Sequence, residues 1–126
     1  MRILVVDDDH VVLLAIARPL RKAGYEVVEA SRIEQVVKAA ESGKFDVAIL
    51  DIFMPGMGGI AAIQRIHAGS PKCKIVAITA GYADMSAEDT IRAAVKIGAA
   101  TGFTKPIDSD ALLTKVREWG APKSED

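Results

Sequence analysis

Short apolar runs alternate along the chain with longer segments that mix apolar and polar residues. The four clear runs are Ile3–Val6, Val27–Val28, Val47–Leu50 and Ile75–Ile78, and a weaker run surrounds Phe103. The clear runs are continuously apolar, a pattern typical of strands that are covered on both faces in a parallel sheet. The sequence therefore predicts five strands.

The segments between these runs carry apolar residues at the spacing i, i+3, i+4 and i+7, or close to it, which places those residues on one face of a helix. The sets are Leu13/Ile16/Ala17/Leu20, Ile33/Val36/Val37/Ala40, Ile60/Ile63/Ile66, Ile91/Ala94/Val95/Gly98 and Leu112/Val116/Trp119. Alternation of strands and helices predicts an α/β fold with right-handed crossovers. We expect a doubly wound (βα)5 domain, in which helices cover both faces of a five-stranded parallel sheet.

Polar residues mark three of the predicted helix starts. Asp9 directly precedes the first helix, where aspartate is a favoured N-cap. Ser31 with Glu34 has the spacing of a capping box for the second helix, and Ser86 with Asp89 has the same spacing for the fourth.

Length and composition narrow the class of protein. The chain has 126 residues, enough for one domain with a sizeable core, and we expect residues 1–120 to form it and 121–126 to be a polar tail. A net charge of −1 argues against nucleic-acid binding through bulk positive charge. A single cysteine, Cys73, excludes an intramolecular disulfide, and the longest apolar stretch, Val11–Ala17, is too short to span a bilayer. We expect a cytoplasmic protein with no direct nucleic-acid or membrane partner.

Polar residues that could carry chemistry follow the predicted strands where each strand ends. Asp7-Asp8-Asp9 follows the first strand, Asp51 the third, Thr79 the fourth and Thr104-Lys105-Pro106 the fifth. In an open parallel sheet, ligands bind beyond the carboxyl ends of the strands, so these side chains should converge. Converging carboxylates repel one another unless a cation lies among them, and all-oxygen ligands favour Mg²⁺. Lys105 and the Thr79 hydroxyl would then hold a phosphoryl group beside the metal.

These strand-end residues belong to four motifs that closely resemble the receiver domain of two-component response regulators. The motifs are Leu4-Val5-Val6-Asp7-Asp8, Ile49-Leu50-Asp51-Ile52-Phe53-Met54-Pro55-Gly56, Ala77-Ile78-Thr79-Ala80 and Thr104-Lys105-Pro106. The resemblance extends over about residues 2–119. It implies the flavodoxin-like strand order 2-1-3-4-5, for which a receiver of this kind is itself a standard example and which the sequence pattern alone does not provide. It also implies a stand-alone, CheY-like domain.

The resemblance also implies roles for individual residues. Asp51 would be the phosphoacceptor, with Thr79 bound to a phosphoryl oxygen by a hydrogen bond and Lys105 by an ion pair. Mg²⁺ would be held by Asp8 and Asp51, by Asp7 partly through water, and by the backbone carbonyl of Phe53.

The function implied is a phosphorylation-operated signalling switch and not an enzyme. It would accept a phosphoryl group from a sensor histidine kinase or a histidine phosphotransfer protein, and then change its binding to an output protein, with no output domain of its own. One alternative of another class is a small haloacid-dehalogenase-like phosphohydrolase. The run Asp7-Asp8-Asp9-His10-Val11 fits the signature of that family, with Asp7 as the nucleophile, although a short motif is weak support.

Two features depart from the receiver pattern. Receivers usually carry Tyr or Phe three residues before the lysine, and here that position is Gly102. Phe103 cannot substitute, because adjacent strand residues point to opposite faces of a sheet. The segment between Thr79 and Gly98 is also longer than in common receivers, so we expect an extended loop after the fourth strand, with Tyr82 as a candidate mobile group.

Overall fold

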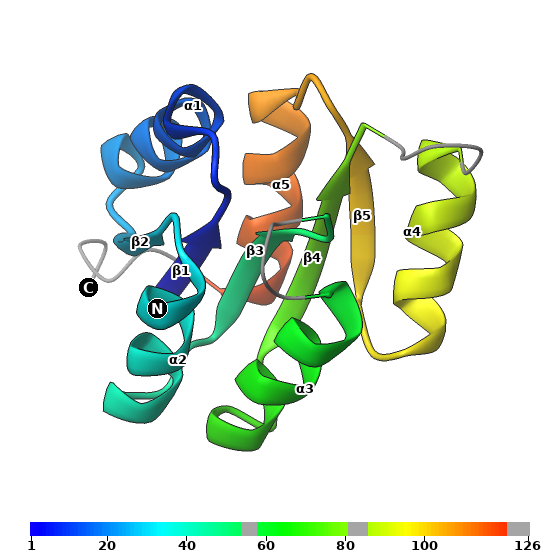
Figure 1. The fold of residues 1–126 in the computed structure, drawn as a ribbon. Helices are drawn as coiled ribbons and strands as arrows, with labels where there is room; N and C mark the ends of the chain where they lie inside the picture. Colours follow the sequence, from blue (N-terminus) through cyan, green and yellow to red (C-terminus); the bar gives the residue numbers. More distant parts are fainter. Residues whose placement is uncertain (54–57, 81–85, 121–126) are drawn as a thin grey trace.

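Five strands and five helices alternate along the chain in the computed structural model, which describes residues 1–53, 58–80 and 86–120 (Figure 1). The predicted βα alternation is therefore confirmed for these ranges. The predicted tail, 121–126, lies outside them. The elements are β1 (Arg2–Val6), α1 (His10–Lys22), β2 (Glu26–Ala30), α2 (Ile33–Ser42), β3 (Val47–Asp51), α3 (Gly59–Gly69), β4 (Lys74–Thr79), α4 (Ala87–Lys96), β5 (Thr101–Thr104) and α5 (Ser109–Trp119).

The five strands form one parallel sheet in the order β2-β1-β3-β4-β5, as expected. All five residues of β3 are buried, because this strand has a neighbour on each side and helices over both faces. The edge strand β2 is less covered, and only Ala30 in it is buried. Continuous hydrophobicity thus predicted the central strands best, since they are the ones buried on both faces.

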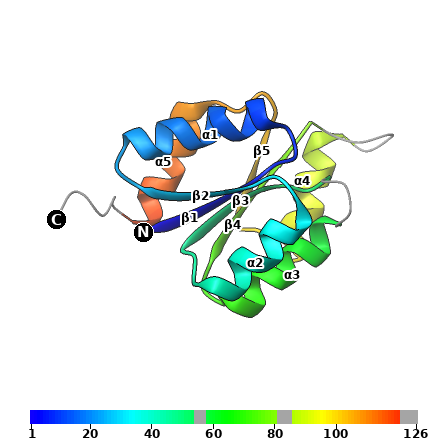
Figure 2. The same cartoon turned by 60° about the vertical axis from the view of Figure 1, so that its left-hand side comes forward.

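The sheet separates two apolar clusters, as a doubly wound fold requires. Leu4 and Leu50 belong to the cluster under α2, α3 and α4, while Ile3 and Ile49 belong to the cluster under α1 and α5. Figure 2 shows α1 and α5 on one side of the sheet and α2, α3 and α4 on the other. Successive strand residues alternate between these two clusters because side chains in a strand point to opposite faces.

Two of the three predicted helix caps are present. An Asp9 Oδ1 accepts a hydrogen bond from the Val11 N–H at 2.9 Å, and the Ser86 hydroxyl oxygen accepts one from the Asp89 N–H at 3.1 Å. The capping box predicted from Ser31 with Glu34 is wrong by one position. The residue that reaches back is Gln35, whose Oε1 accepts hydrogen bonds from the Ser31 and Arg32 N–H groups.

The fourth predicted helix face is partly wrong. Ala94 of α4 is buried and Ile91 is half-buried, but Val95 is 46% exposed. Thr90 is buried in its place, and its hydroxyl donates a hydrogen bond to the Ser86 carbonyl oxygen at 2.8 Å. Because this internal bond satisfies the hydroxyl, a threonine can lie on the buried face of the helix, which apolar spacing alone does not reveal.

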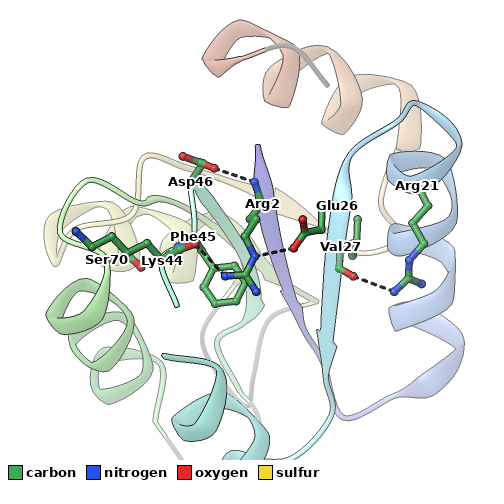
Figure 3. A network of polar contacts seen from close by, with 8 residues as sticks. All are labelled: Arg2, Arg21, Glu26, Val27, Lys44, Phe45, Asp46 and Ser70. Atoms are coloured by element: carbon green, nitrogen blue, oxygen red, sulfur yellow. Dashed lines mark hydrogen bonds and ion pairs between the residues drawn. The ribbon is translucent and has the colours of Figure 1, made fainter. Parts of the chain in front are cut away.

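Arg2 ties three segments together at the edge of the sheet where the strands begin, far from the strand ends (Figure 3). Its Nε donates to Glu26 Oε2 at 2.7 Å, its backbone N–H donates to Asp46 Oδ2 at 2.8 Å, and its guanidinium lies 4.5 Å from the ring centroid of Phe45. The Arg2 and Glu26 side chains are 35% and 50% exposed, so their ion pair contributes at most about 1 kcal/mol. We therefore interpret these contacts as part of the fold and not as a functional site.

Cys73 lies just before β4 and is 5% exposed. Burial, together with the negative charge of Asp46, raises the pKa of its thiol to about 12. A thiol in an unfolded chain has a pKa of about 8.5, so at pH 8 the folded protein should react with a disulfide reagent about a thousandfold or more slowly than the unfolded chain. A thiol-release assay with and without denaturant measures both rates. Native and unfolded rates within tenfold of each other would contradict this prediction.

None of the helices in the described ranges combines the length and the apolar character needed to cross a membrane.

Candidate functional site

The strand ends bring four of the predicted site residues to one edge of the sheet. Asp7 directly follows β1, Asp51 ends β3, Thr79 ends β4 and Lys105 follows β5. Backbone hydrogen bonds extend the ladder past the strand ends, from the Asp7 N–H to the Ala30 carbonyl oxygen at 3.1 Å and from the Lys105 N–H to the Thr79 carbonyl oxygen at 2.9 Å. The convergence expected from the sequence is therefore observed.

Lys105 joins the first and third strand ends through its ammonium group. Its Nζ lies 2.9 Å from Asp7 Oδ2 and 3.0 Å from Asp51 Oδ2. The Asp7 side chain is 0% exposed, that of Asp51 is 10% exposed and that of Lys105 is 20% exposed, so these charges interact with little screening by water. Lys105 is expected to pair with a phosphoryl group on Asp51 and here lies against the Asp51 carboxylate itself, while its contact with Asp7 was not anticipated. The only signal for it in the sequence is the length of the lysine side chain, which can reach across intervening strands.

The pKa values of this group follow from burial and pairing. Burial raises the pKa of Asp7, although Lys105 and the Asp9 N–H partly oppose the rise. Burial acts to lower the pKa of Lys105, but the hydrogen bonds and charges of Asp7 and Asp51 outweigh it and raise that pKa. Lys105 is therefore fully protonated at neutral pH.

The carboxylates of Asp7, Asp8 and Asp51 form a cluster whose ligand oxygens lie within 4.8 Å of one another. Three carboxylates against the one ammonium of Lys105 leave two negative charges, which one divalent cation would cancel. Asp7 Oδ2 is buried, and the Lys105 ammonium lies 2.9 Å from it. A group of carboxylate oxygens is the kind of ligand set that a hard cation prefers. The donor set therefore fits Mg²⁺.

Hydrogen bonds from the backbone hold two of these carboxylates in place. Asp7 Oδ1 accepts from the Asp9 N–H at 2.9 Å, and Asp51 Oδ1 accepts from the Phe53 N–H at 2.9 Å. Each bond spans two residues, so the carboxylate is fixed relative to the turn that follows its strand. Asp8 belongs to the same cluster but is exposed, which leaves its side chain accessible from solvent.

The remaining predicted residues lie beside this group. Thr79 is 0% exposed at the end of β4, and the Phe53 side chain is 38% exposed. The Lys105–Pro106 peptide bond, which follows β5, is cis. The residues Met54, Pro55 and Gly56 of the second motif lie outside the described ranges, as does Tyr82.

Gly102, where the sequence departs from the receiver pattern, lies against Ile91 of α4. A Cβ atom at this glycine would lie 2.7 Å from Ile91 Cγ2 and 2.8 Å from Ile91 Cγ1. Real Cβ contacts are essentially never shorter than 3.0 Å, so Ile91 fills the space that a side chain at position 102 would need. Phe103 packs on the other side of the sheet, on the cluster under α1 and α5.

A model of the response regulator receiver domain matches residues 3–117. The chain belongs to this family. Receiver domains are phosphoacceptor signalling domains, and they generally use Mg²⁺ bound by an acidic cluster of this kind. The haloacid-dehalogenase-like alternative is therefore not favoured.

Individual relatives differ in how much of their length this chain covers. It is 33% identical over 92% of its own length to a cyclic di-GMP phosphodiesterase of Thermotoga maritima, but spans only 30% of that protein. It is 33% identical to a chemotaxis protein CheY of Treponema pallidum, over 91% of this chain and 79% of that one. Among solved structures, a response regulator protein of Burkholderia pseudomallei with a phosphorylated aspartic acid and a calcium ion matches with a TM-score of 0.77 and 28% identity, covering 93% of this chain and 71% of that one.

Proposed function

We propose that residues 1–120 of this protein are a signalling switch that is operated by phosphorylation of Asp51. The phosphoryl donor is a sensor histidine kinase or a histidine phosphotransfer protein, and the phosphorylated form binds a different set of partners. The observation that carries this proposal is the position of Asp51 Oδ2, 3.0 Å from the Lys105 ammonium and inside a cluster of three carboxylates. We also propose the cytoplasm as its compartment, where phosphoryl donors formed from ATP are found.

The chemistry assigned to Asp51 is nucleophilic attack by one carboxylate oxygen on the phosphorus atom of the donor. A bond from that oxygen to phosphorus forms, and the bond from phosphorus to the donor's histidine nitrogen breaks, with its electron pair leaving on the nitrogen. Two anions must approach each other in this step, and the positive charge of Lys105 lowers their repulsion. The Thr79 hydroxyl donates a hydrogen bond to a phosphoryl oxygen once the group has been transferred.

Asp8, Asp51 and the backbone carbonyl of Phe53 are the residues we assign as Mg²⁺ ligands, with Asp7 acting partly through water. When bound, the ion supplies positive charge that stabilises the oxygens of the phosphoryl group. Asp7 also orients Lys105 through their 2.9 Å ion pair, so it has a positioning role besides its part in the metal site.

Mg²⁺ is expected to bind in the millimolar range or somewhat more tightly, because a few carboxylates hold this strongly hydrated ion only moderately well. Titration with Mg²⁺ while amide chemical shifts are followed should perturb the signals of Asp7, Asp51 and Lys105. Asp8→Asn should weaken binding about tenfold or more, whereas Asp110→Asn, which removes an exposed carboxylate on α5, should leave it unchanged. Shifts confined to other parts of the chain would contradict the assigned site.

A further inference from the structure

Strand β2 lies at one edge of the sheet, with β1 as its neighbour on one side. The Ala30 carbonyl oxygen accepts a hydrogen bond from the Asp7 N–H, so the backbone groups of Ala30 face the β1 side. Backbone groups point alternately to the two sides of a strand, so those of Val28 also face β1, while those of Val27 and Glu29 face away from it. These two residues therefore present backbone donors and acceptors at the edge, an arrangement that favours pairing with another strand.

Arg21, in the last turn of α1, covers this edge. Figure 3 shows its guanidinium group reaching the Val27 carbonyl oxygen, to which Nη2 donates a hydrogen bond at 3.0 Å. Its Nη1 also forms an ion pair with Glu29 Oε2. One side chain thus contacts both outward-facing residues, and it lies where the backbone of an added strand would have to lie.

The contacts of Arg21 are not what holds β2 in the fold. The side chains of Arg21 and Glu29 are 45% and 27% exposed, and ion pairs as exposed as this one contribute little to stability. The strand is held by its parallel ladder with β1 and by its apolar side chains, since Ala30 is buried and Val27 and Val28 are half-buried against the two clusters. Loss of the arginine should therefore leave the domain folded and the edge open.

A second copy of the chain fits this edge when the two β2 strands run antiparallel about Val28. Val27 of each copy then lies opposite Glu29 of the other, and the two pairs exchange about four backbone hydrogen bonds. The two Val28 residues face each other as a pair without backbone hydrogen bonds, which is close enough for apolar contact. Like charges are not directly opposed, because Glu26 of one copy lies opposite Ala30 of the other.

We propose that the free edge of β2 is a strand-pairing surface for a second copy of this chain, and that Arg21 keeps it closed. The guanidinium group and the second strand need the same space and the same Val27 carbonyl oxygen, so the closed and paired states exclude each other. The two copies form an isologous interface, in which the same surface is used on both sides. This inference does not depend on the function proposed above, since none of the residues assigned to the phosphoryl group or to Mg²⁺ takes part in the pairing.

The test measures self-association of the full chain by sedimentation velocity over a range of protein concentrations. Arg21→Ala should form a dimer about tenfold or more tightly than the wild type does, because it leaves the outward-facing backbone groups of β2 open. Arg18→Ala is the matched control. It removes the same charge from an exposed position of the same helix, and it should behave as the wild type.

Hydrogen exchange identifies the surface that is used. The N–H groups of Val27 and Glu29 should exchange about tenfold or more slowly in the Arg21→Ala dimer than in the wild type, because both become donors to the second strand. A dimer in which these two groups exchange as fast as in the wild type would form through another surface, and would overturn the inference.

A second variant keeps the inference testable if circular dichroism shows that Arg21→Ala does not fold. Glu29→Gln removes the carboxylate that holds the guanidinium group, and it leaves the backbone of β2 unchanged. Its self-association should rise above that of the wild type, but less than that of Arg21→Ala, because the hydrogen bond from Arg21 to Val27 remains. If neither variant, or the one that folds, associates more tightly than Arg18→Ala, Arg21 does not close a pairing surface and the inference is wrong.

Discussion

Asp51→Asn is expected to reduce labelling of the protein by a small phosphodonor such as acetyl phosphate at least a hundredfold. The amide that replaces the carboxylate is a poor nucleophile, and the other carboxylate that lies against Lys105, that of Asp7, has a side chain that is 0% exposed. The wild-type label should be lost on treatment with hydroxylamine, as expected for an acyl phosphate. Radiolabelling followed by mapping of the modified peptide measures both quantities.

Asp7→Asn is the matched comparison for this experiment, because Asp7 also pairs with Lys105 and belongs to the same cluster. It should weaken labelling without abolishing it, since Asp51 keeps its contact with Lys105. Undiminished labelling of Asp51→Asn would contradict the assignment of the phosphoacceptor. A label that maps to Asp7 would support the phosphohydrolase alternative.

The same Asp7→Asn variant is expected to be more stable than the wild type when no metal is present. Burial raises the pKa of Asp7, so ionisation of this group opposes folding. The stability that its protonated form contributes is fully present below the unfolded pKa, near 3.8, and is lost as the pH rises through the folded pKa. At pH 7 an uncharged asparagine should remove this cost of burying a carboxylate, so the Tm of the metal-free variant should be higher than that of the wild type.

Thermal unfolding in the presence of a chelator at pH 7 and pH 4 measures this effect. The difference between Asp7→Asn and the wild type should be larger at pH 7, where Asp7 is ionised in the unfolded chain. Asp8→Asn is the control, because this neighbouring carboxylate is exposed, and its change should stay within about 0.5 kcal/mol. A variant less stable than the wild type at pH 7 would contradict the prediction.

Mg²⁺ should reduce this difference in stability. With a dissociation constant of about 1 mM, 10 mM Mg²⁺ would stabilise the wild type by about 1.4 kcal/mol, because the ion binds the folded chain only. Asp7→Asn should gain less than half of that. The negative charge of Asp7, which destabilises the metal-free protein, thus contributes to stability when Mg²⁺ is bound.

The sequence was sufficient to predict the fold class, since continuous apolar runs such as Val47–Leu50 and helical spacing between them leave few alternatives to a doubly wound sheet. The strand order was inferred from the family resemblance and not from the pattern. The prediction that was wrong concerns the buried face of a single helix. Hydrophobic spacing assigned Val95 to the buried face of its helix, but the choice between Val95 and Thr90 depends on how the helix is seated on the sheet.

The convergence of the site residues could also be predicted, because the carboxyl ends of parallel strands meet at one edge. The pairing of Lys105 with both Asp7 and Asp51 could not, since it depends on the path of a long side chain between two buried acceptors. The contact of Ile91 with Gly102 could not be predicted from the sequence either. The sequence shows that a glycine replaces an aromatic residue, but not which side chain from another element fills the space.

Ile91 occupies the space that a side chain at position 102 would need, and this constrains the order in which substitutions can accumulate. A larger residue at position 102 meets the γ-carbons of Ile91 at once, so that change is penalised while isoleucine is present. Reduction of Ile91 to a smaller residue first opens the space and makes the same change at position 102 tolerable. An evolutionary path from this chain to the usual aromatic residue therefore passes through position 91, and the two positions are expected to vary together, with opposite changes in volume, among close homologues.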